Sequence, residues 1–240
     1  MSKELVVIPT YNESENIGDL ISDILELGLD ILIIDDNSPD NTSKIIKEHE
    51  HYNSKIFLLS RDKKLGLGSA YREGFQKGID MEYEFFVQMD ADFSHGVEDL
   101  KRMLSQIESN EVIIGSRYIN GGRIIGWSKG RHLLSFIANL YSKLFTFSYV
   151  SDMTSGFRIY SIGALRNIKY KETKSNGYAF QIEMTVLCLI NKLEIKEMPI
   201  TFHERREGKS KMNKGVVFEA FPKVLLLSLL RIRSWFLTTT

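Results

Sequence analysis

The chain has 240 residues, of which 43% are hydrophobic and 26% are charged, so it is long enough for one large folded domain and too apolar to be disordered. Its single cysteine, Cys188, excludes an intramolecular disulfide framework and a cysteine-based zinc cluster. Residues 1–9 lack the basic stretch and apolar run that begin a secretory signal, so we expect none.

Charge is balanced over the whole chain but segregated along it. Residues 1–100 carry 9 Lys and Arg against 21 Asp and Glu, whereas residues 101–240 carry 22 against 10. An acidic first part followed by a basic remainder makes a dipolar molecule. This asymmetry favours cation binding on one side and an anionic partner on the other, the alternative being an ordinary spread of surface charge.

The first half alternates short apolar runs, typical of buried strands, with segments of helix length. Asn12 and Glu15 form a possible capping box before a helix over 17–27, and Ser38 followed by Pro39 predicts another helix start. This alternation predicts a Rossmann-like α/β domain with a mostly parallel central sheet and helices on both faces. The predicted strands are 5–9, 31–35, 55–60, 84–90 and 112–116.

The second half is less regular. We expect strands over 156–161 and 195–202, a helix over 180–191 between them, and two long apolar helices over 129–147 and 215–237. Charged and polar residues interrupt both long helices, so neither meets the roughly 20 predominantly apolar residues that a membrane span requires.

Acidic side chains follow three of the predicted strands. In an open parallel sheet, ligands bind beyond the carboxyl ends of the strands. Asp90 and Asp92 are two residues apart in extended chain, so both carboxylates point the same way and reach one cation. Such oxygen ligands select Mg²⁺ or Mn²⁺, which also bind substrate phosphates. The acids at strand ends are Glu13, Asp35, Asp36, Asp90 and Asp92.

Several common active-site motifs are missing from the sequence. There is no GxxxxGK[ST] phosphate loop, no GxSxG nucleophile elbow and no HExxH metal motif. Gly66-Leu67-Gly68 lacks the third glycine of a dinucleotide fingerprint, which disfavours a dehydrogenase. These two glycines are better explained by a tight turn from strand to helix than by phosphate binding.

The order and spacing of the remaining motifs resemble the dolichol-phosphate (polyprenol-phosphate) mannosyltransferases, which are inverting glycosyltransferases of the glycosyltransferase-A fold. The resemblance covers residues 5 to about 215. It is carried by Pro9-Thr10-Tyr11-Asn12-Glu13, Asp35-Asp36, Lys64-Leu65-Gly66-Leu67-Gly68, Asp90-Ala91-Asp92, Gly115-Ser116-Arg117-Tyr118, Thr154-Ser155-Gly156-Phe157-Arg158, Gly177-Tyr178-Ala179-Phe180-Gln181-Ile182-Glu183-Met184 and Phe202-x-x-Arg205-x-x-Gly208-x-Ser210-Lys211.

The resemblance implies a role for each matching residue. The catalytic residues would be Asp92, Arg117 and Arg205. Metal ligands would be Asp90, Asp92 and Ser94, with Ser94 standing where some relatives carry Gln. The lipid phosphate would meet Arg117, Arg131 and Ser135. The residues that would bind the donor GDP-mannose are Pro9, Tyr11, Glu13, Ile34, Asp36, Asp90, Ala91, Asp92, Arg117, Arg205 and Lys211.

The resemblance also implies the reaction, which is transfer of mannose from GDP-mannose to a polyprenyl (dolichyl) phosphate with inversion, dependent on Mg²⁺ or Mn²⁺. A divalent cation stabilises the departing nucleoside diphosphate. The lipid phosphate is already anionic, so the site needs arginines more than a strong base. Two alternatives stay open: another donor, UDP-glucose or UDP-N-acetylglucosamine, and a non-catalytic subunit that binds lipid or partner proteins.

Four residues also have structural explanations. Ordinary ion pairs are the alternative explanation for Arg117, which we favour as functional, and for Arg158, which we leave open. His95 beside the acidic loop is better explained by packing than by catalysis. Glu183, on an otherwise apolar helix, is either functional or a buried partner for an arginine.

The predicted organisation is a catalytic domain over 1–213, with a nucleotide-sugar half (1–116) and an acceptor half (117–213), followed by an amphipathic membrane-interface helix over 214–240. Apolar stripes flanked by Lys and Arg favour helices lying in a membrane surface, although core packing explains either helix alone. We expect a peripheral protein on the cytoplasmic face of a membrane, with a possible small membrane-protein partner and no nucleic acid. Some members of the family that it resembles carry further transmembrane helices.

Overall fold

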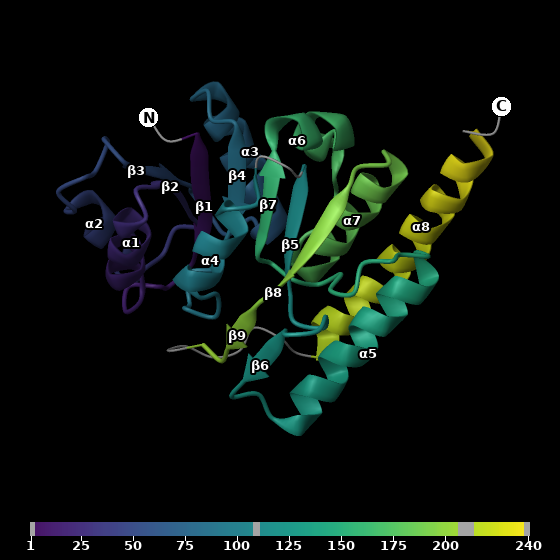
Figure 1. Ribbon diagram of the computed structural model, residues 1–240. Helices are drawn as coiled ribbons and strands as arrows, with labels where there is room; N and C mark the ends of the chain where they lie inside the picture. The colour runs from purple at the N-terminus through teal and green to yellow at the C-terminus, as the bar shows by residue number, and fades with distance from the viewer. Residues whose placement is uncertain (1–2, 108–110, 206–213, 238–240) are drawn as a thin grey trace.

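The computed structural model describes residues 3–107, 111–205 and 214–237. Its centre is a seven-stranded sheet with the order β3-β2-β1-β4-β7-β5-β8 (Figure 1). These strands are β1 (Glu4–Thr10), β2 (Asp30–Asp35), β3 (Ile56–Ser60), β4 (Phe85–Gln88), β5 (Val112–Ser116), β7 (Arg158–Ser161) and β8 (Ile195–Pro199). The short strands β6 (Arg123–Ile125) and β9 (Thr201–His203) form a separate pair.

The sheet is mostly parallel, as the sequence predicts. Only β7 runs antiparallel to its neighbours, β4 and β5. Because β7 comes from the second half of the chain and lies between two strands of the first half, the predicted nucleotide-sugar and acceptor halves share one sheet. The site that they form is therefore held on a single rigid framework.

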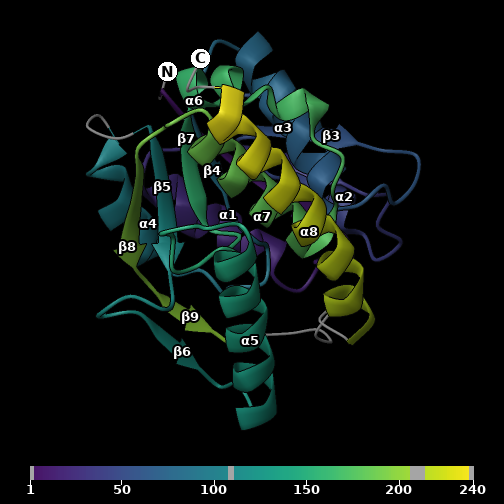
Figure 2. The ribbon, with the colours of Figure 1, turned by 90° about the vertical axis from the view of Figure 1, so that its right-hand side faces the viewer.

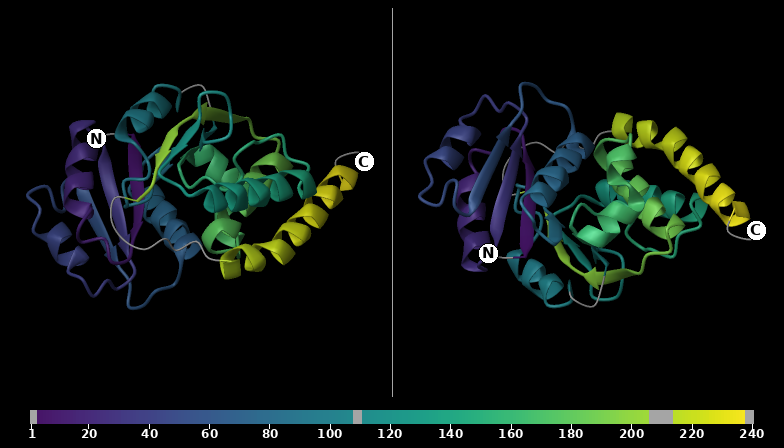
Figure 3. Two further views of the ribbon diagram at one scale, coloured as in Figure 1. Left: turned by 90° about the horizontal axis from the view of Figure 1, so that it is seen from below. Right: turned by 90° about the horizontal axis from the view of Figure 1, so that it is seen from above.

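Helices cover both faces of the sheet (Figure 3). The helices α1, α2 and α4 bury apolar side chains on one face, and α3, α6 and α7 do so on the other. The helix α8 lies outside α7 and also contacts α5 (Figure 2). The helices are α1 (Ile17–Glu26), α2 (Thr42–Lys47), α3 (Leu67–Asp80), α4 (Val97–Leu104), α5 (Lys129–Phe145), α6 (Ile162–Ile168), α7 (Gly177–Ile190) and α8 (Lys214–Leu237).

The capping residues predicted for the helices of the first half are wrong. The helix α1 begins at Ile17 as predicted, but its N-cap is Asn16, and Asn12, with a φ of 59°, makes no capping box. Ser38 does not cap a helix, because its hydroxyl and N–H both donate to Asp35 at the end of β2. Short polar side chains bond nearby backbone and side chains as readily as they cap helices. Here they fix the loops beyond the strand ends.

The predicted strand 195–202 is divided into two. The chain leaves the large sheet after Pro199, and Ile200 donates its N–H to the carbonyl of Ser116 at 3.1 Å. The strand β9 then pairs with β6 in the small sheet. This switch carries the chain, and with it Arg205, across the carboxyl ends of the parallel strands.

Candidate functional site

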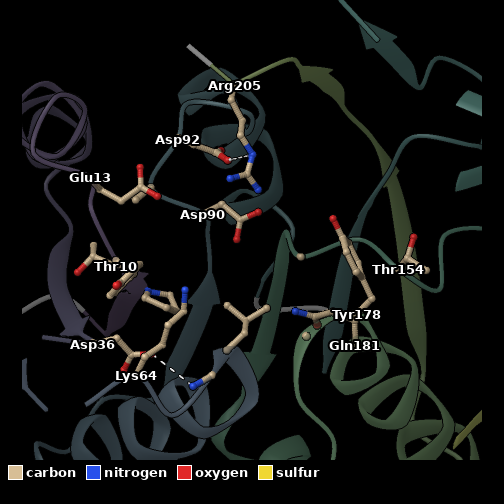
Figure 4. Close-up of a pocket in the computed structure, with 17 residues that line it drawn as sticks. Thr10, Glu13, Asp36, Lys64, Asp90, Asp92, Thr154, Tyr178, Gln181 and Arg205 are labelled. Atoms are coloured by element: carbon tan, nitrogen blue, oxygen red, sulfur yellow. Dashed lines mark hydrogen bonds and ion pairs between the residues drawn. The ribbon is translucent and has the colours of Figure 1, made fainter. Parts of the chain in front are cut away.

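A cavity of about 560 Å³ opens where β1, β2 and β4 end, which is where ligands bind in open parallel sheets (Figure 4). Residues from both halves of the sequence form its wall. Eight of the predicted donor-binding residues line it: Pro9, Tyr11, Glu13, Asp36, Asp90, Ala91, Asp92 and Arg205. The structure therefore brings these eight residues together in one wall.

The acid pair lies at the middle of the cavity, opposite Arg205 (Figure 4). Asp92 is 3% exposed, accepts a hydrogen bond from the N–H of Ser94 at 3.1 Å and forms an ion pair with Nε of Arg205 at 2.9 Å. The positively charged side chain of Arg205, from the second half of the chain, thus contacts a carboxylate from the first half. A chelating pair of acids and a guanidinium at one point is suited to a metal-bound diphosphate.

His95 supports the acidic loop from behind. Its Nδ1 accepts the N–H of Asp90 at 3.2 Å, and its ring stacks on Phe157 at a centroid distance of 4.7 Å. Burial lowers the pKa of His95, although Asp90 and Asp92 act in the opposite direction. His95 therefore packs as a neutral ring, in agreement with the structural explanation drawn from the sequence.

Asp36 and Asp35 differ although they are neighbours. Asp36 lines the cavity and forms an ion pair with the buried Arg61, which also donates to the hydroxyl of Ser69 at 2.8 Å. Asp35 is not among the lining residues; it accepts hydrogen bonds from Thr10, from Ser38 in the following loop and from Ser43 at the start of α2. Four of the five strand-end acids therefore face the cavity, and the fifth holds the loop.

The turn of Gly66 and Gly68 has the structural role that the sequence predicts. Gly66 has a φ of +94°, and a Cβ on Gly68 would lie 2.4 Å from the carbonyl oxygen of Ser175. The turn brings Lys64 to the cavity, where its Nζ lies 3.8 Å from the ring centroid of Tyr11. The sequence motif contains Lys64, but a lysine in a loop gives no signal of its own.

Three further lining residues with polar side chains come from the second half and were given no role from the sequence. Thr154 follows α5 in the chain, and Tyr178 and Gln181 lie on the first turns of α7. Burial and the charge of Asp90 raise the pKa of the Tyr178 hydroxyl, against the opposing effect of nearby arginines, so it stays protonated at neutral pH. All three belong to motifs that carried the family resemblance.

Arg117 does not reach the cavity, contrary to the prediction. Its Nε and Nη2 each bond a carboxylate oxygen of Asp152 at 2.8 Å, and Nη2 also donates to Thr154 at 2.8 Å. Although burial acts against ionisation of both groups, their mutual attraction raises the pKa of Arg117 and lowers that of Asp152. Arg117 therefore holds Thr154 in the cavity wall, and Thr154 separates it from the cavity.

The other predicted side chains also lie away from the cavity wall. Ile34 is fully buried in the apolar core, and the buried hydroxyl of Ser135 accepts from Tyr118 at 2.8 Å. Arg131 lies over Trp127, 4.1 Å from the ring centroid, and pairs with Glu204 at 3.1 Å. Ser94 is buried beneath the acidic loop. Lys211 lies outside the described residues.

Arg158 and Glu183 prove to be structural. The guanidinium of Arg158 is completely buried and donates to the carbonyls of Met153, Ser155 and Gln181. Glu183 accepts main-chain N–H groups of the segment before α7, and its charge also acts on the neighbouring Arg72. Both fix α7 beside the cavity.

Sequence comparison decides the family. Residues 5–169 match the profile described as Glycosyl transferase family 2, a span that includes all three groups of strand-end acids. The chain belongs to glycosyl transferase family 2. Within it, this chain is 38% identical, over 92% of its length, to an undecaprenyl-phosphate mannosyltransferase of Micrococcus luteus, of which 91% is covered. It is also 38% identical, over 92%, to a polyprenol monophosphomannose synthase of Mycolicibacterium smegmatis, of which 85% is covered.

Solved structures agree on the fold of this family 2 chain. Glucosyl-3-phosphoglycerate synthase from Mycobacterium tuberculosis, in complex with Mn²⁺ and UDP-glucose, has a TM-score of 0.68 at 16% identity. The match covers 94% of this chain and 78% of the other. Mannosyl-3-phosphoglycerate synthase from Rubrobacter xylanophilus has a TM-score of 0.64 at 16% identity, over 96% and 74%. The glycosyltransferase-A-like architecture predicted from the sequence is thus confirmed.

The apolar stripes predicted on the two long helices are largely exposed. Leu133 and Leu144 on α5 are 60% and 61% exposed, whereas Tyr141 packs on Phe221 of α8 at a centroid distance of 4.2 Å. No helix in the described part of the chain is long and apolar enough to cross a membrane. Exposed large apolar residues of this region are Leu133, Phe136, Ile137, Leu140, Leu144, Phe145, Phe147, Tyr149, Phe221, Leu225, Leu226, Leu229, Leu230, Trp235 and Phe236.

Proposed function

We propose that this chain transfers mannose from GDP-mannose to a polyprenyl phosphate, with inversion at the anomeric carbon and with a bound Mg²⁺ or Mn²⁺. The observation that carries the proposal is the meeting of Asp90, Asp92 and Arg205 in one strand-end cavity. This cavity lies in a chain 38% identical to an undecaprenyl-phosphate mannosyltransferase along almost its whole length.

The residues present fit a divalent cation of this type. Over residues 3–107, 111–205 and 214–237, no group of three or more His, Cys, Asp and Glu side chains is arranged to hold a metal alone. Mg²⁺ commonly takes one or two carboxylates and completes its shell with water and substrate phosphates. Asp90 and Asp92 supply those carboxylates, and Ser94 helps by donating its N–H to Asp92. The cation would neutralise charge that develops on the departing diphosphate.

The cations of the second half would gather the two phosphate groups. Arg205 already reaches the acid pair, and Arg131 pairs with Glu204, the residue that precedes Arg205 in the chain. Arginine binds phosphate oxygens through two parallel hydrogen bonds and holds them against their mutual repulsion. Arg117 would act indirectly, by fixing Thr154.

The chemistry follows from these placements. A phosphate monoester oxygen is anionic near neutral pH, so it attacks the anomeric carbon without first losing a proton to a base. Neutral His95 and protonated Tyr178 agree with a site that contains no strong base at this point. Direct displacement from the face opposite the leaving diphosphate inverts the configuration of an α-linked donor to a β-linked product.

A lipid acceptor requires contact with a membrane, and the exposed apolar residues of α5 and α8 are the surface that we assign to it. Helices with exposed Leu, Phe and Trp and with flanking cations lie in the membrane–water interface. Lys129, Arg131 and Lys143 are the flanking cations on α5. We place the protein at the cytoplasmic face of a membrane, held peripherally through this surface.

A donor panel tests the proposal. The protein would be mixed with a short polyprenyl phosphate in detergent, Mg²⁺ or Mn²⁺, and in separate reactions GDP-mannose, UDP-glucose or UDP-N-acetylglucosamine. We expect lipid-linked mannose to form fastest. Equal or faster transfer from a UDP-sugar would overturn the donor assignment, and absence of every lipid product would overturn the enzymatic one.

A further inference from the structure

One end of the cavity is formed by the beginning of α7, across from Lys64 (Figure 4). This end contains Tyr178 and Gln181 of α7 together with Thr154. It lies on the far side of the acid pair from the wall formed by β1 and β2. A ligand whose charged centre sits at Asp90 and Asp92 therefore extends toward Tyr11 in one direction and toward Gln181 in the other.

The amide of Gln181 stands out in this wall. The residue is only 1% exposed, yet neither Oε1 nor Nε2 has a hydrogen-bond partner within the described residues. Its backbone is well anchored, because its carbonyl accepts from Nη1 of Arg158 at 3.0 Å and from the hydroxyl of Thr185 at 2.9 Å. The backbone of Gln181 is thus fixed, and its unpaired amide lies beside the cavity.

A buried amide without partners is unfavourable, and native proteins keep such groups mostly where a ligand or an ordered water satisfies them. A glutamine amide presents one acceptor and two donors side by side. Sugar hydroxyls match this pattern because each both donates and accepts, whereas phosphate oxygens only accept. A diphosphate would satisfy only the Nε2 donors and leave Oε1 unpaired, whereas sugar hydroxyls can satisfy both atoms of the Gln181 amide.

We infer that Gln181 is a specificity-determining residue that hydrogen-bonds hydroxyl groups of the donor's sugar. The inference rests on the proposed function, since it assumes a nucleotide-sugar with its diphosphate at the acid pair. Within that arrangement the nucleoside occupies the Tyr11 and Lys64 end and the sugar the α7 end. Gln181 then hydrogen-bonds the sugar hydroxyls, while Asp90, Asp92 and Arg205 bind the charged diphosphate and its cation.

The test compares ligands with and without the sugar. For Gln181→Leu, which keeps the approximate size and removes the polar atoms, we expect the affinity for GDP to stay within about twofold. We expect kcat/KM for GDP-mannose to fall about 10- to 100-fold, the effect of losing one or two hydrogen bonds in a dry pocket. If the affinity for GDP falls by the same factor as kcat/KM for GDP-mannose, Gln181 has a packing role and the inference is overturned.

Deoxy-mannose donors identify the hydroxyl group. The wild type should lose activity with the one or two analogues that lack the contacted hydroxyls, and Gln181→Leu should not distinguish these analogues from GDP-mannose. If the penalties for all analogues are the same in both proteins, Gln181 does not read the sugar.

Gln88 provides a matched control. It is also a fully buried glutamine with an unpaired amide, but it is not among the cavity-lining residues. We expect Gln88→Leu to change the affinities for GDP and GDP-mannose by the same factor. If the variant affects GDP-mannose selectively to the same extent as Gln181→Leu, the inference fails. If the wild type transfers mannose from GDP-mannose and Gln181→Leu does so with the same kcat/KM, only this inference is rejected. If the wild type transfers no mannose, the proposed function is rejected.

Discussion

The acid pair in the cavity and the ion pair of Arg117 and Asp152 behind its wall use buried charge in opposite ways. The acid pair and Arg205 meet at a cavity, where a ligand can reach them. Arg117 and Asp152 are as strongly charged, but they bond each other at two positions and are enclosed on all sides. Charge that faces a cavity is available to a substrate, whereas charge saturated by protein partners fixes the framework. The two arginines, which the sequence placed in the same role, are distinguished by their partners.

The largest expected effect is on the cavity side of this comparison. Asp92→Asn removes one of the two carboxylates for the cation, so we expect transfer to fall by about 10³-fold. The melting temperature should change little, because the amide can still accept from Arg205 and Ser94. Initial rates at saturating donor, together with thermal melting, measure both quantities. A rate within threefold of the wild type would remove the acid pair from the mechanism.

The opposite pattern is expected for the framework pair. Asp152→Asn leaves the buried Arg117 without its counter-charge, which costs about 3–5 kcal/mol of unfolding free energy. Urea unfolding measures this loss. Surface substitutions typically change the unfolding free energy by about 0.5 kcal/mol. An unfolding free energy of Asp152→Asn within about 1 kcal/mol of the wild type would therefore show that the pair does not stabilise the fold.

The same pair makes stability depend on acidity. The pKa of Asp152 is lower in the folded protein than its ordinary value, so the pair stabilises the fold at pH values above that ordinary value. The contribution is lost as the pH falls below it. The difference in unfolding free energy between the wild type and Asp152→Asn should therefore shrink on acidification below about pH 4. A difference independent of pH would contradict the ion-pair assignment.

The exposed face of α5 should matter for the acceptor and not for the fold. Leu133→Asn combined with Leu144→Asn should weaken binding to anionic lipid vesicles by about 10-fold or more, because each exposed leucine otherwise buries apolar area in the bilayer. The affinity for GDP and the melting temperature should be unchanged. Unaltered vesicle binding would show that this face does not contact lipid.

A smaller effect is expected at Lys64. Lys64→Met removes the cation over the ring of Tyr11, a contact worth about 0.5–1 kcal/mol at an accessible site, so GDP should bind about threefold more weakly. Calorimetric titration of GDP measures the change. Tighter binding by the variant would place Lys64 away from the ligand.

The sequence predicted the framework and the acidic wall well because both depend on local patterns. Apolar runs define the buried strands, and acids at their carboxyl ends must meet at one edge of a parallel sheet. The pairing of Arg117 with Asp152 was not predictable in this way. The two residues are 35 positions apart, and only the tertiary fold brings them together.

Helix starts and the α7 end of the cavity show the same limit. Ser38 has the sequence pattern of a helix cap, but in the folded loop its hydroxyl donates to Asp35 instead. Gln181 belongs to an apolar helix, and its significance appears only once its amide is seen buried, unpaired and beside the cavity. Exposure of the α5 leucines likewise depends on which elements cover them.

The most direct test of the central claim is the identity of the product. The protein would be incubated with GDP-mannose, Mg²⁺ and a polyprenyl phosphate in vesicles, and the lipid extract analysed by mass spectrometry and by NMR of the anomeric centre. We predict a β-linked polyprenyl-phosphate mannose formed in equal amount with GDP. Release of free mannose without a lipid product, or an α-linked lipid, would contradict the account.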